Sequence, residues 1–416
     1  MSVTEICRTG RTGGKLKVPI RKRFETREPT DYYGVVEEVV DADPNNARTR
    51  SFLLIDAVRA DLFDRDGAQV IENRGALALI RAMSTPRRWE EQFGLGEITK
   101  GEWLSFRLDD SGEIPRAWEL RADNNYAAGP SRSIAAMRRL NSSGAIMQAG
   151  DDKLVMSLMR TTSLPTQKQP RVSADRAMGR LGIDGNIEII ILDVGQASAA
   201  LIKRNGKAIG FFDVGAPIWF NKGSLPKSIS HPSVPGGFVI LSHWDFDHFD
   251  LGRRHQPYRK LDWYAPDQPV GPNTARFQAD LGNRLTFIDG PASGGGFSLE
   301  RGTSTDSSDR NGSGYQLRYE KDGRAVLLTG DTSYDFIQGH MLHGIGGLTI
   351  PHHGGRSAMA PPGAIAPWRA IASYGAPNSY RHPHPQTLAD HVSQGWRVAA
   401  TARTLLGSRG NRRLYP

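Results

Sequence analysis

The stretch GFVILSHWDFDHFD, residues 237–250, joins a short apolar run to a cluster of two histidines and three aspartates. The run from Phe238 to Leu241 has the length and composition of a buried strand. Carboxylates placed this close together repel one another and lose solvation, so they need either open water or a cation. The stretch therefore predicts a metal site at the end of a buried strand, and a polar surface loop is the alternative interpretation.

The composition is that of a globular chain with room for two hydrophobic cores. Of its 416 residues, 38% are apolar and 23% are charged. No apolar run reaches the ~20 residues of a membrane helix, so we expect no membrane span. The N-terminus lacks the apolar core of a secretory signal, which makes a cytoplasmic location the expectation. Cys7 is the only cysteine, so an intrachain disulfide is excluded and a metal would be held by His, Asp or Glu.

An excess of basic residues favours a polyanionic partner. The formal net charge is +9 and the isoelectric point is near 9.6, and Lys and Arg attract phosphates and release their counterions. Nucleic acid is therefore the expected partner. Residues 1–30 form a basic arm that either binds nucleic acid or is simply solvated. The candidate phosphate contacts beside the metal motif are Arg253, Arg254, Arg259 and Lys260.

The first half of the chain predicts a separate, partly β-rich N-terminal domain over residues 31–160. The runs YYGVVEEVV, SFLLIDAV and GEWLSFRLDD indicate short strands of a small β-barrel or sheet. An oligonucleotide-binding barrel would present Trp103 and Phe106 for base stacking. Apolar spacing predicts helices between 133 and 159, and composition predicts a linker over 161–182. Such a domain could also recruit a protein partner.

Residues 183–416 predict an α/β domain whose strands deliver polar side chains to one rim. The runs IEIIILDV and KAIGFFDVG flank Asn205-Gly206, a strong signal for a two-residue hairpin. The runs GFVIL, RAVLLTGD and LTIPHHGG are further strands that end at acidic or histidine side chains. Layered sheets build sites in this way. The polar strand ends outside the opening stretch are Asp193, Asp213, Asp331, His352 and His353.

His243, Asp245, Asp247 and His248 carry the candidate metal chemistry of the opening stretch. On a tight loop this spacing lets one short segment supply ligands to two metal ions, whose charge the carboxylates offset. A single ion, with Asp245 as a hydrogen-bonding residue, is the alternative.

The segment YRHPHP places His382 and His384 between prolines. Proline fixes φ and removes a backbone donor, so these side chains are held on a stiff segment. One of the two histidines could contact a phosphate or protonate a leaving oxygen. A rigid turn on the surface is the alternative.

Six motifs in the second half occur in the order of a known superfamily. They are DVGQ, FFDVG, LSHWDFDH, LLTGD, IPHHGG and NSYRHPHP. In this order they resemble the metallo-β-lactamase superfamily, and more narrowly the hydrolase domain of the late-competence DNA-uptake channel proteins, the ComEC-like branch. The resemblance covers residues 185–416 and none of the first half. It implies an αβ/βα sandwich with two divalent metal ions, usually zinc, at the shared edge of two sheets.

The resemblance also implies the metal ligands. His243 would bind the first metal, and Asp247 and His248 would bind the second. Asp331 would bridge both ions, and His353 would complete the second site. Asp247 and Asp331 would thus be catalytic as well as structural members of the centre.

Further residues receive roles from the same resemblance, and one departs from the family pattern. His352 would contact substrate, and Asp193 and Asp213 would orient the ligands. Asp245 stands where the family has a second histidine, and residues 256–330 contain no histidine. Oxygen ligands are harder than imidazole, which shifts the preference of the first site from Zn²⁺ toward Mn²⁺ or Mg²⁺.

These observations predict a metal-dependent phosphodiesterase, most simply a nuclease that acts on DNA or RNA. Such an enzyme could serve as a regulated effector. One alternative is a hydrolase of a small phosphodiester, a phosphocholine-type ester or a lactone, because one fold hosts many chemistries. Another is a binding or assembly subunit whose hydrolase domain is inactive or is activated by a partner.

Overall fold

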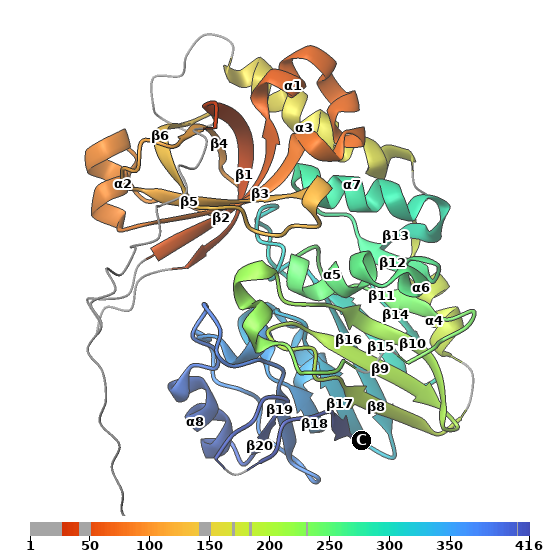
Figure 1. Ribbon diagram of the computed structural model, residues 1–416. Helices are drawn as coiled ribbons and strands as arrows, with labels where there is room; N and C mark the ends of the chain where they lie inside the picture. The colour runs from red at the N-terminus through yellow and green to blue at the C-terminus, as the bar shows by residue number, and fades with distance from the viewer. Residues whose placement is uncertain are drawn as a thin grey trace, which may run out of the picture.

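The computed structural model describes residues 27–40, 51–140, 151–168, 171–182, 185–229, 232–405 and 407–416. Most of the predicted basic arm, and Cys7, lie outside these residues. A β-barrel built from the first part of the chain lies against a larger body of two sheets and their helices (Figure 1). Within the described residues, no helix has both the length and the apolar character needed to cross a membrane.

The barrel closes in the strand order β1-β2-β3-β5-β6-β4. Tyr32, Ile55, Ile80 and Leu104 are among the side chains that fill it. The predicted barrel is therefore confirmed. Its strands are β1 (Thr30–Val40), β2 (Ser51–Arg59), β3 (Leu77–Ser84), β4 (Trp103–Asp109), β5 (Arg116–Arg121) and β6 (Arg132–Arg139). The helices beside it are α1 (Ala60–Asp66), η1 (Gly67–Glu72), η2 (Arg74–Ala76), α2 (Pro86–Phe93), η3 (Ala122–Asn124) and α3 (Asp151–Lys168).

Two expectations for this region are wrong. Trp103 and Phe106 are only 5% and 2% exposed, because both pack into hydrophobic cores, so neither is available to stack on a base. Residues 132–139 form β6 instead of a helix. The register between β4 and β6 shifts so that Ile134 pairs with Leu108 and Met137 pairs with Phe106. This bulge brings two side chains three residues apart to the same face, which imitates helical spacing.

Segment 161–182 is not the irregular linker expected from its composition. Residues up to Lys168 continue α3, whose Leu158 is buried. The strand β7 (Arg171–Ser173) pairs with the edge of a sheet, and α4 (Asp175–Leu181) buries Ala177 and Met178 against the same body. Apolar burial and strand pairing outweigh the polar composition of the segment.

The first sheet of the larger body has the order β21-β8-β9-β10-β11-β12-β13-β7. Strands β9 and β10 are antiparallel and are joined by Asn205 and Gly206, both with positive φ, which confirms the predicted turn. Its first strand is β9 and not the run IEIIILDV, which forms β8 on the other side of β9. From β10 to β7 the neighbouring strands run parallel. The strands are β8 (Ile187–Ile191), β9 (Ala199–Arg204), β10 (Lys207–Val214), β11 (Phe238–Ile240), β12 (Asp262–Pro266), β13 (Leu285–Asp289) and β21 (Arg412–Leu414).

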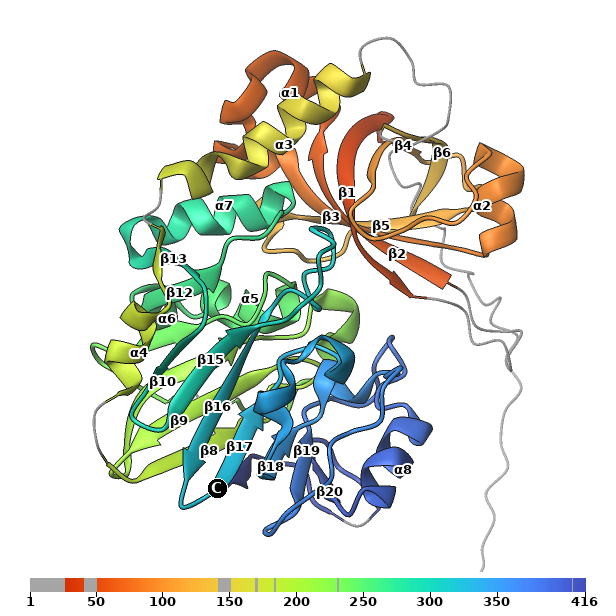
Figure 2. The ribbon, with the colours of Figure 1, turned by 180° about the vertical axis from the view of Figure 1, so that it is seen from behind.

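The second sheet faces the first and has the order β14-β15-β16-β17-β18-β19-β20 (Figure 2). Apolar side chains of both sheets form one core, with Ile202 and Phe212 from the first and Leu317 and Val326 from the second. The strands are β14 (Ala292–Gly294), β15 (Phe297–Arg301), β16 (Tyr315–Lys321), β17 (Arg324–Leu328), β18 (Ile345–Thr349), β19 (Arg369–Ala372) and β20 (Arg397–Ala400).

Helices cover the outer faces of both sheets. Along β10 the side chains alternate, so that Phe211 packs toward the helices while Phe212 packs between the sheets. The result is a layered mixed α/β body. Its helices are α5 (Phe246–Arg254), α6 (Gln256–Arg259), α7 (Pro272–Leu281) and α8 (Pro385–Ser393), with short turns η4 (Trp219–Ser224), η5 (Gly282–Arg284), η6 (Tyr334–Phe336), η7 (Gly339–Leu342) and η8 (Pro351–Gly354).

The barrel packs directly on this body. Leu54, Leu79 and Leu120 of the barrel belong to the same hydrophobic core as Phe249 and Phe277 under the first sheet. Helix α3 lies beside α7 (Figures 1 and 2). Because the two regions share a core, the structure does not show the separate N-terminal domain that the sequence suggested.

Candidate metal centre

The centre lies where strands of both sheets end. Asp213 is near the end of β10, and Ser242 and His243 follow β11. Asp331 follows β17, and His353 lies in η8 after β18. Carboxyl ends of neighbouring parallel strands meet at one rim, which is why residues so far apart in sequence gather here.

The backbone of several of these residues is unusual. Asp213, His352 and His353 have positive φ values of 61°, 49° and 54°, a conformation that residues other than glycine rarely adopt. Such conformations persist only where surrounding contacts hold them, and they concentrate at functional sites. The two consecutive histidines turn the chain sharply after β18.

Helix α5 supplies the other part of the centre. Asp245 is its N-cap residue, and Asp247 and His248 lie in its first turn. The close fit of this turn against β10 requires Gly215, since a Cβ atom there would lie 1.6 Å from the carbonyl oxygen of Asp247. The glycine of the FFDVG motif thus lets the first turn of α5 reach the rim.

Each of three imidazoles uses its Nδ1 atom to hold its ring in place. His248 Nδ1 lies 2.7 Å from Asp213 Oδ2, and His353 Nδ1 lies 2.6 Å from the carbonyl oxygen of Ser373. The Ser242 hydroxyl donates to Asp213 at 2.8 Å, so it accepts from His243 Nδ1 at 2.9 Å. All three rings therefore carry a proton on Nδ1, which turns Nε2 toward the centre, where it can bind either a proton or a metal ion.

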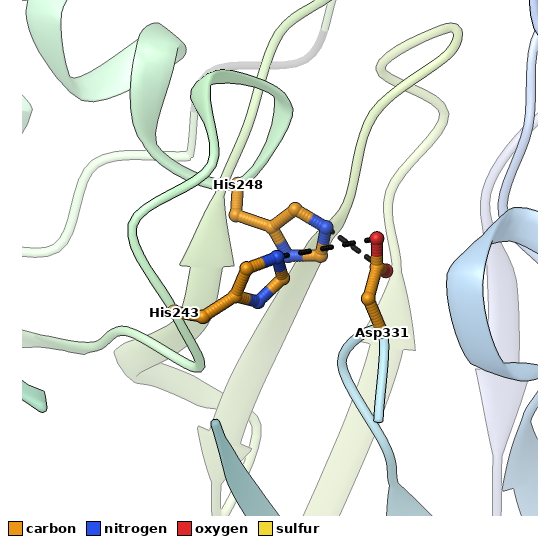
Figure 3. Close-up of side chains that lie close together, drawn as sticks. All are labelled: His243, His248 and Asp331. Atoms are coloured by element: carbon orange, nitrogen blue, oxygen red, sulfur yellow. Dashed lines mark ion pairs between the residues drawn. The ribbon is translucent and has the colours of Figure 1, made fainter. Parts of the chain in front are cut away.

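The three Nε2 atoms converge on two carboxylates. His248 Nε2 lies 3.0 Å from Asp331 Oδ1, and His243 Nε2 lies 4.0 Å from Asp331 Oδ2 (Figure 3). His353 Nε2 lies 3.1 Å from Asp247 Oδ2. His243 and His248 are fully buried, and neither Nε2 has a hydrogen-bond partner. Lone pairs that face carboxylate oxygens across these distances repel one another unless a proton or a cation lies between them.

The donor set fits divalent metal ions. Two groups have ligand atoms within 4.8 Å of one another, His243 with His248 and Asp331, and Asp247 with His248 and His353. Imidazole nitrogen and carboxylate oxygen are the ligands of zinc, and their mixture also suits manganese. The second group, with Asp331 beside it, offers one ion four ligand side chains.

The charges of the buried carboxyl groups also favour a site for divalent metal ions. Burial alone would raise the pKa of Asp331, but the neighbouring His248, His353 and His352 outweigh it and hold the pKa well below its usual range. Burial likewise would raise the pKa of Asp247, and His353 and His248 lower it instead. Both carboxyl groups are therefore ionised at neutral pH and can act as ligands.

Asp245 is engaged differently from the other members of the opening stretch. Its Oδ2 atom accepts a hydrogen bond from Lys100 Nζ at 3.0 Å and lies 3.4 Å from His243 Nε2. Its Oδ1 atom lies 2.8 Å from Arg310 Nη2. Asp245 belongs to neither of the two groups of candidate ligands described above, so its predicted role as a metal ligand stays a prediction.

His352 and His382 lie beside the ligands. His352 Nε2 is 3.9 Å from Asp331 Oδ2, and its side chain is 40% exposed. The rings of His352 and His382 are 5.0 Å apart. Burial, and then repulsion by His352 and His353, lowers the pKa of His382 to about 2. His382 is therefore neutral and can donate or accept a hydrogen bond, and its predicted role in contacting a phosphate or protonating a leaving oxygen stays a prediction.

His384 is placed as the residue before α8, and its Nδ1 atom is buried without a hydrogen-bond partner. Asp193 has a different environment from Asp213. It accepts hydrogen bonds from Arg409 Nε and Nη2 at 2.5 and 2.8 Å, and no contact among the described residues joins it to a candidate ligand. The role of orienting ligands falls to Asp213 instead.

Two of the four predicted phosphate contacts are held within the chain. Arg253 and Arg254 both pair with Asp250, which is fully buried. Arg253 also lies over the ring of Tyr126. These contacts are structural, because Asp250 needs compensating charge. Lys260 is exposed and Arg259 is half-buried, at the end of α6.

The barrel contributes residues that the sequence did not identify. Besides Lys100, Glu38 of β1 forms a hydrogen bond with Tyr380, and the charges of Asp247 and Asp245 act on it. Burial first, and then Asp247, raises the pKa of Glu38 well above its usual range. A single lysine in a loop and a glutamate in a strand carry no local motif, so only the fold reveals them.

Comparisons with known proteins give little. No protein-family model and no curated protein matches the chain. One similar solved structure is a protein of unknown function from Enterococcus faecalis V583, with 12% identity over 36% of this chain and 44% of that chain and a TM-score of 0.23. Another is a B3 metallo-β-lactamase with an active-site glutamic acid, with 14% identity over 55% of this chain and 77% of that chain and a TM-score of 0.20. Similarity at this level does not establish a shared fold.

Proposed function

We propose that the chain is a metal-dependent hydrolase of the metallo-β-lactamase type that cleaves phosphodiester bonds in DNA or RNA. The observation that carries the proposal is the convergence of three buried imidazole Nε2 atoms on Asp247 and Asp331. The order of motifs along the sequence supports the same superfamily. The proposal assigns the ligands as His243, Asp247, His248, Asp331 and His353.

The chemistry follows from what such a donor set can hold. When bound, one or two divalent ions, Zn²⁺ or Mn²⁺, acidify a water molecule and offset charge on phosphate oxygens. Asp213 keeps the proton of His248 on Nδ1 and so keeps Nε2 available as a ligand. Asp331, with one oxygen toward His248 and the other toward His243, joins the two groups of ligands.

His382 suits a role in substrate contact. The Gln196 amide lies 3.4 Å from His382 Nδ1 and can donate to it, which leaves the proton on Nε2. A neutral imidazole with that tautomer donates a hydrogen bond to a phosphate oxygen or to the leaving oxygen. His352, half-exposed beside Asp331, is the second candidate for contact with the substrate.

The test combines metal content with hydrolysis. The chain, purified without chelator, is expected to contain zinc or manganese by elemental analysis and to cleave single- or double-stranded DNA or RNA. His353→Ala and Asp331→Asn should lose bound metal and cleavage. His340→Ala is the matched control, because His340 is 63% exposed and pairs with Glu300 away from the centre. Wild-type protein that binds no divalent ion would overturn the proposal.

A second candidate substrate is a small phosphodiester or another small ester, and one observation favours it. Lys100 and Glu38 of the barrel reach Asp245 and Tyr380 at the centre, so the barrel covers part of the rim. Salt dependence separates the two substrates. If the substrate is nucleic acid, the affinity of Asp331→Asn protein for labelled oligonucleotides should fall as salt is added. In a plot of log affinity against log salt, each phosphate contacted should contribute about −0.9 to the slope for duplex DNA, or about −0.7 for single strands. Affinity that does not change with salt would favour the small ester.

A further inference from the structure

We infer that Lys100 of the barrel is a positioning residue that keeps Asp245 from binding a metal ion beside His243. The inference rests on the proposed function, because it concerns the same metal centre. It assigns the barrel a part in deciding how many ions the centre holds.

The contact between Lys100 and Asp245 blocks a specific oxygen. Lys100 lies in the segment between α2 and β4, and its Nζ atom donates to Asp245 Oδ2 at 3.0 Å and to Asn311 Oδ1 at 3.4 Å. Oδ2 is also the oxygen that faces His243 Nε2, 3.4 Å away. An ion shared by His243 and Asp245 would have to compete with the ammonium group for this oxygen.

The other oxygen of Asp245 is also occupied. Arg310 Nη2 lies 2.8 Å from Oδ1, and Arg310 forms a second ion pair with Glu37 of β1. Arg310 and Glu37 are only 5% and 4% exposed. Two fixed cations thus neutralise the carboxylate, and they also repel a divalent ion that approaches it.

The acidic ligands on the other side of the centre, Asp247 and Asp331, differ from Asp245 in their ion pairs. Among the described residues, no Lys or Arg forms an ion pair with Asp247 or Asp331. The position formed by Asp247, His248 and His353 is therefore free to bind a cation tightly. The position beside His243 is weak as long as Lys100 holds Asp245, so the two positions differ in affinity.

Titration of metal into the full chain tests this. The protein is stripped with chelator, and Zn²⁺ or Mn²⁺ is added in a calorimeter. The wild type should bind one ion tightly and a second ion more weakly. Lys100→Met should tighten the second ion at least tenfold and leave the first unchanged. Lys100→Gln, which removes the charge but keeps a polar side chain, should give the same gain, and Lys100→Arg should behave like the wild type.

Two controls separate positioning from a purely structural role. Lys153→Met changes a lysine that lines the same groove of ≈1760 Å³ as Lys100, and it should not affect metal binding. In an Asp245→Asn background, Lys100→Met should give no gain, because the carboxylate that it would release is absent. A lysine that only stabilises the fold would change the melting temperature without tightening any ion.

The outcomes are distinct from those of the proposed function. Wild-type protein without any bound ion overturns the proposed function. Ions bound to the wild type, with a second ion that is bound no more tightly in Lys100→Met and Lys100→Gln, overturn the role of Lys100 alone. A gain in affinity that persists without the Asp245 carboxylate also overturns it.

Discussion

Asp56 of the barrel strand β2 caps the first turn of α7 through Asn273. It accepts hydrogen bonds from the backbone and side-chain nitrogens of Asn273 at 2.9 and 2.6 Å and from the backbone of Thr274 at 3.3 Å. The first N–H groups of a helix have no partner within the helix, and here the carboxyl group of a residue distant in sequence supplies one. Gly271 leaves room for it, since a Cβ atom there would lie 2.4 Å from the Asp56 carboxyl group.

Asp56→Ala should therefore destabilise the protein by about 3 kcal/mol, because it leaves several buried donors without an acceptor. Urea unfolding measures the change. Asp31→Ala is the matched control, since Asp31 also lies in a barrel strand but pairs with Arg107 on the surface, where its side chain is 48% exposed. The free energy of unfolding of this control variant should fall by less than about 1 kcal/mol. Equal losses of unfolding free energy in the two variants would contradict the stabilising role of the Asp56 cap.

Asp213→Ala should weaken metal binding by about 10–100-fold, because His248 loses the acceptor that fixes its tautomer and orientation. Competition with a fluorescent chelator gives the affinity. Asp193→Ala is the control with the same local sequence, Asp-Val-Gly, but its carboxylate pairs with Arg409. It should retain wild-type metal affinity. Metal binding that is equally sensitive to both aspartates would contradict the geometry.

Gly215→Ala should abolish metal binding without changing any ligand. The added Cβ atom would lie 1.6 Å from the Asp247 carbonyl oxygen, so the first turn of α5 has to move. Gly223→Ala, at a position where a Cβ atom meets nothing within 4 Å, should leave metal content unchanged. Elemental analysis of both purified variants, with circular dichroism to check folding, decides the point.

The depressed pKa of His382 predicts a pH dependence of stability. The folded imidazole stays neutral down to about pH 2, while the unfolded side chain takes up a proton below about pH 6.5. Stability is therefore lost as the pH falls below about 6.5, by up to about 1.4 kcal/mol per pH unit for this group. Metal-free His382→Gln should show a shallower loss between about pH 6.5 and 5. His340→Gln, at an exposed histidine, should keep the wild-type slope, and a steeper loss in His382→Gln would refute the prediction.

The sequence indicated the rim of the centre because its ligands follow apolar runs directly. His243, Asp331 and His353 each stand three or four residues beyond a strand, and that pattern is local. The local pattern could not show which of Asp193 and Asp213 orients a ligand, because both begin the tripeptide Asp-Val-Gly. Their difference comes from sheet order: β10 lies next to β11, after which His243 follows, whereas β8 lies between β9 and β21.

Contacts between the two halves of the chain could not be predicted. Lys100 and Asp245 are brought together only by the packing of the barrel on the larger body of two sheets. The strand β6 was misread for a different reason, since a bulge places Ile134 and Met137 on one face. In both cases the deciding interaction involves residues that are distant in sequence, where periodicity and composition carry no information.

The pairing of β21 with β8 has a consequence for the newly made chain. Leu414 pairs with Ile189 and Arg412 with Ile191, so the isoleucine-rich β8 keeps an open backbone edge until the last of these strands has been synthesised. At about 5–20 residues per second, that edge stays unpaired for a time on the order of ten to forty seconds. Open edges of this kind invite pairing with other chains. Chaperone binding during translation should thus concentrate on β8, and loss of β21 should lead to aggregation in the cell.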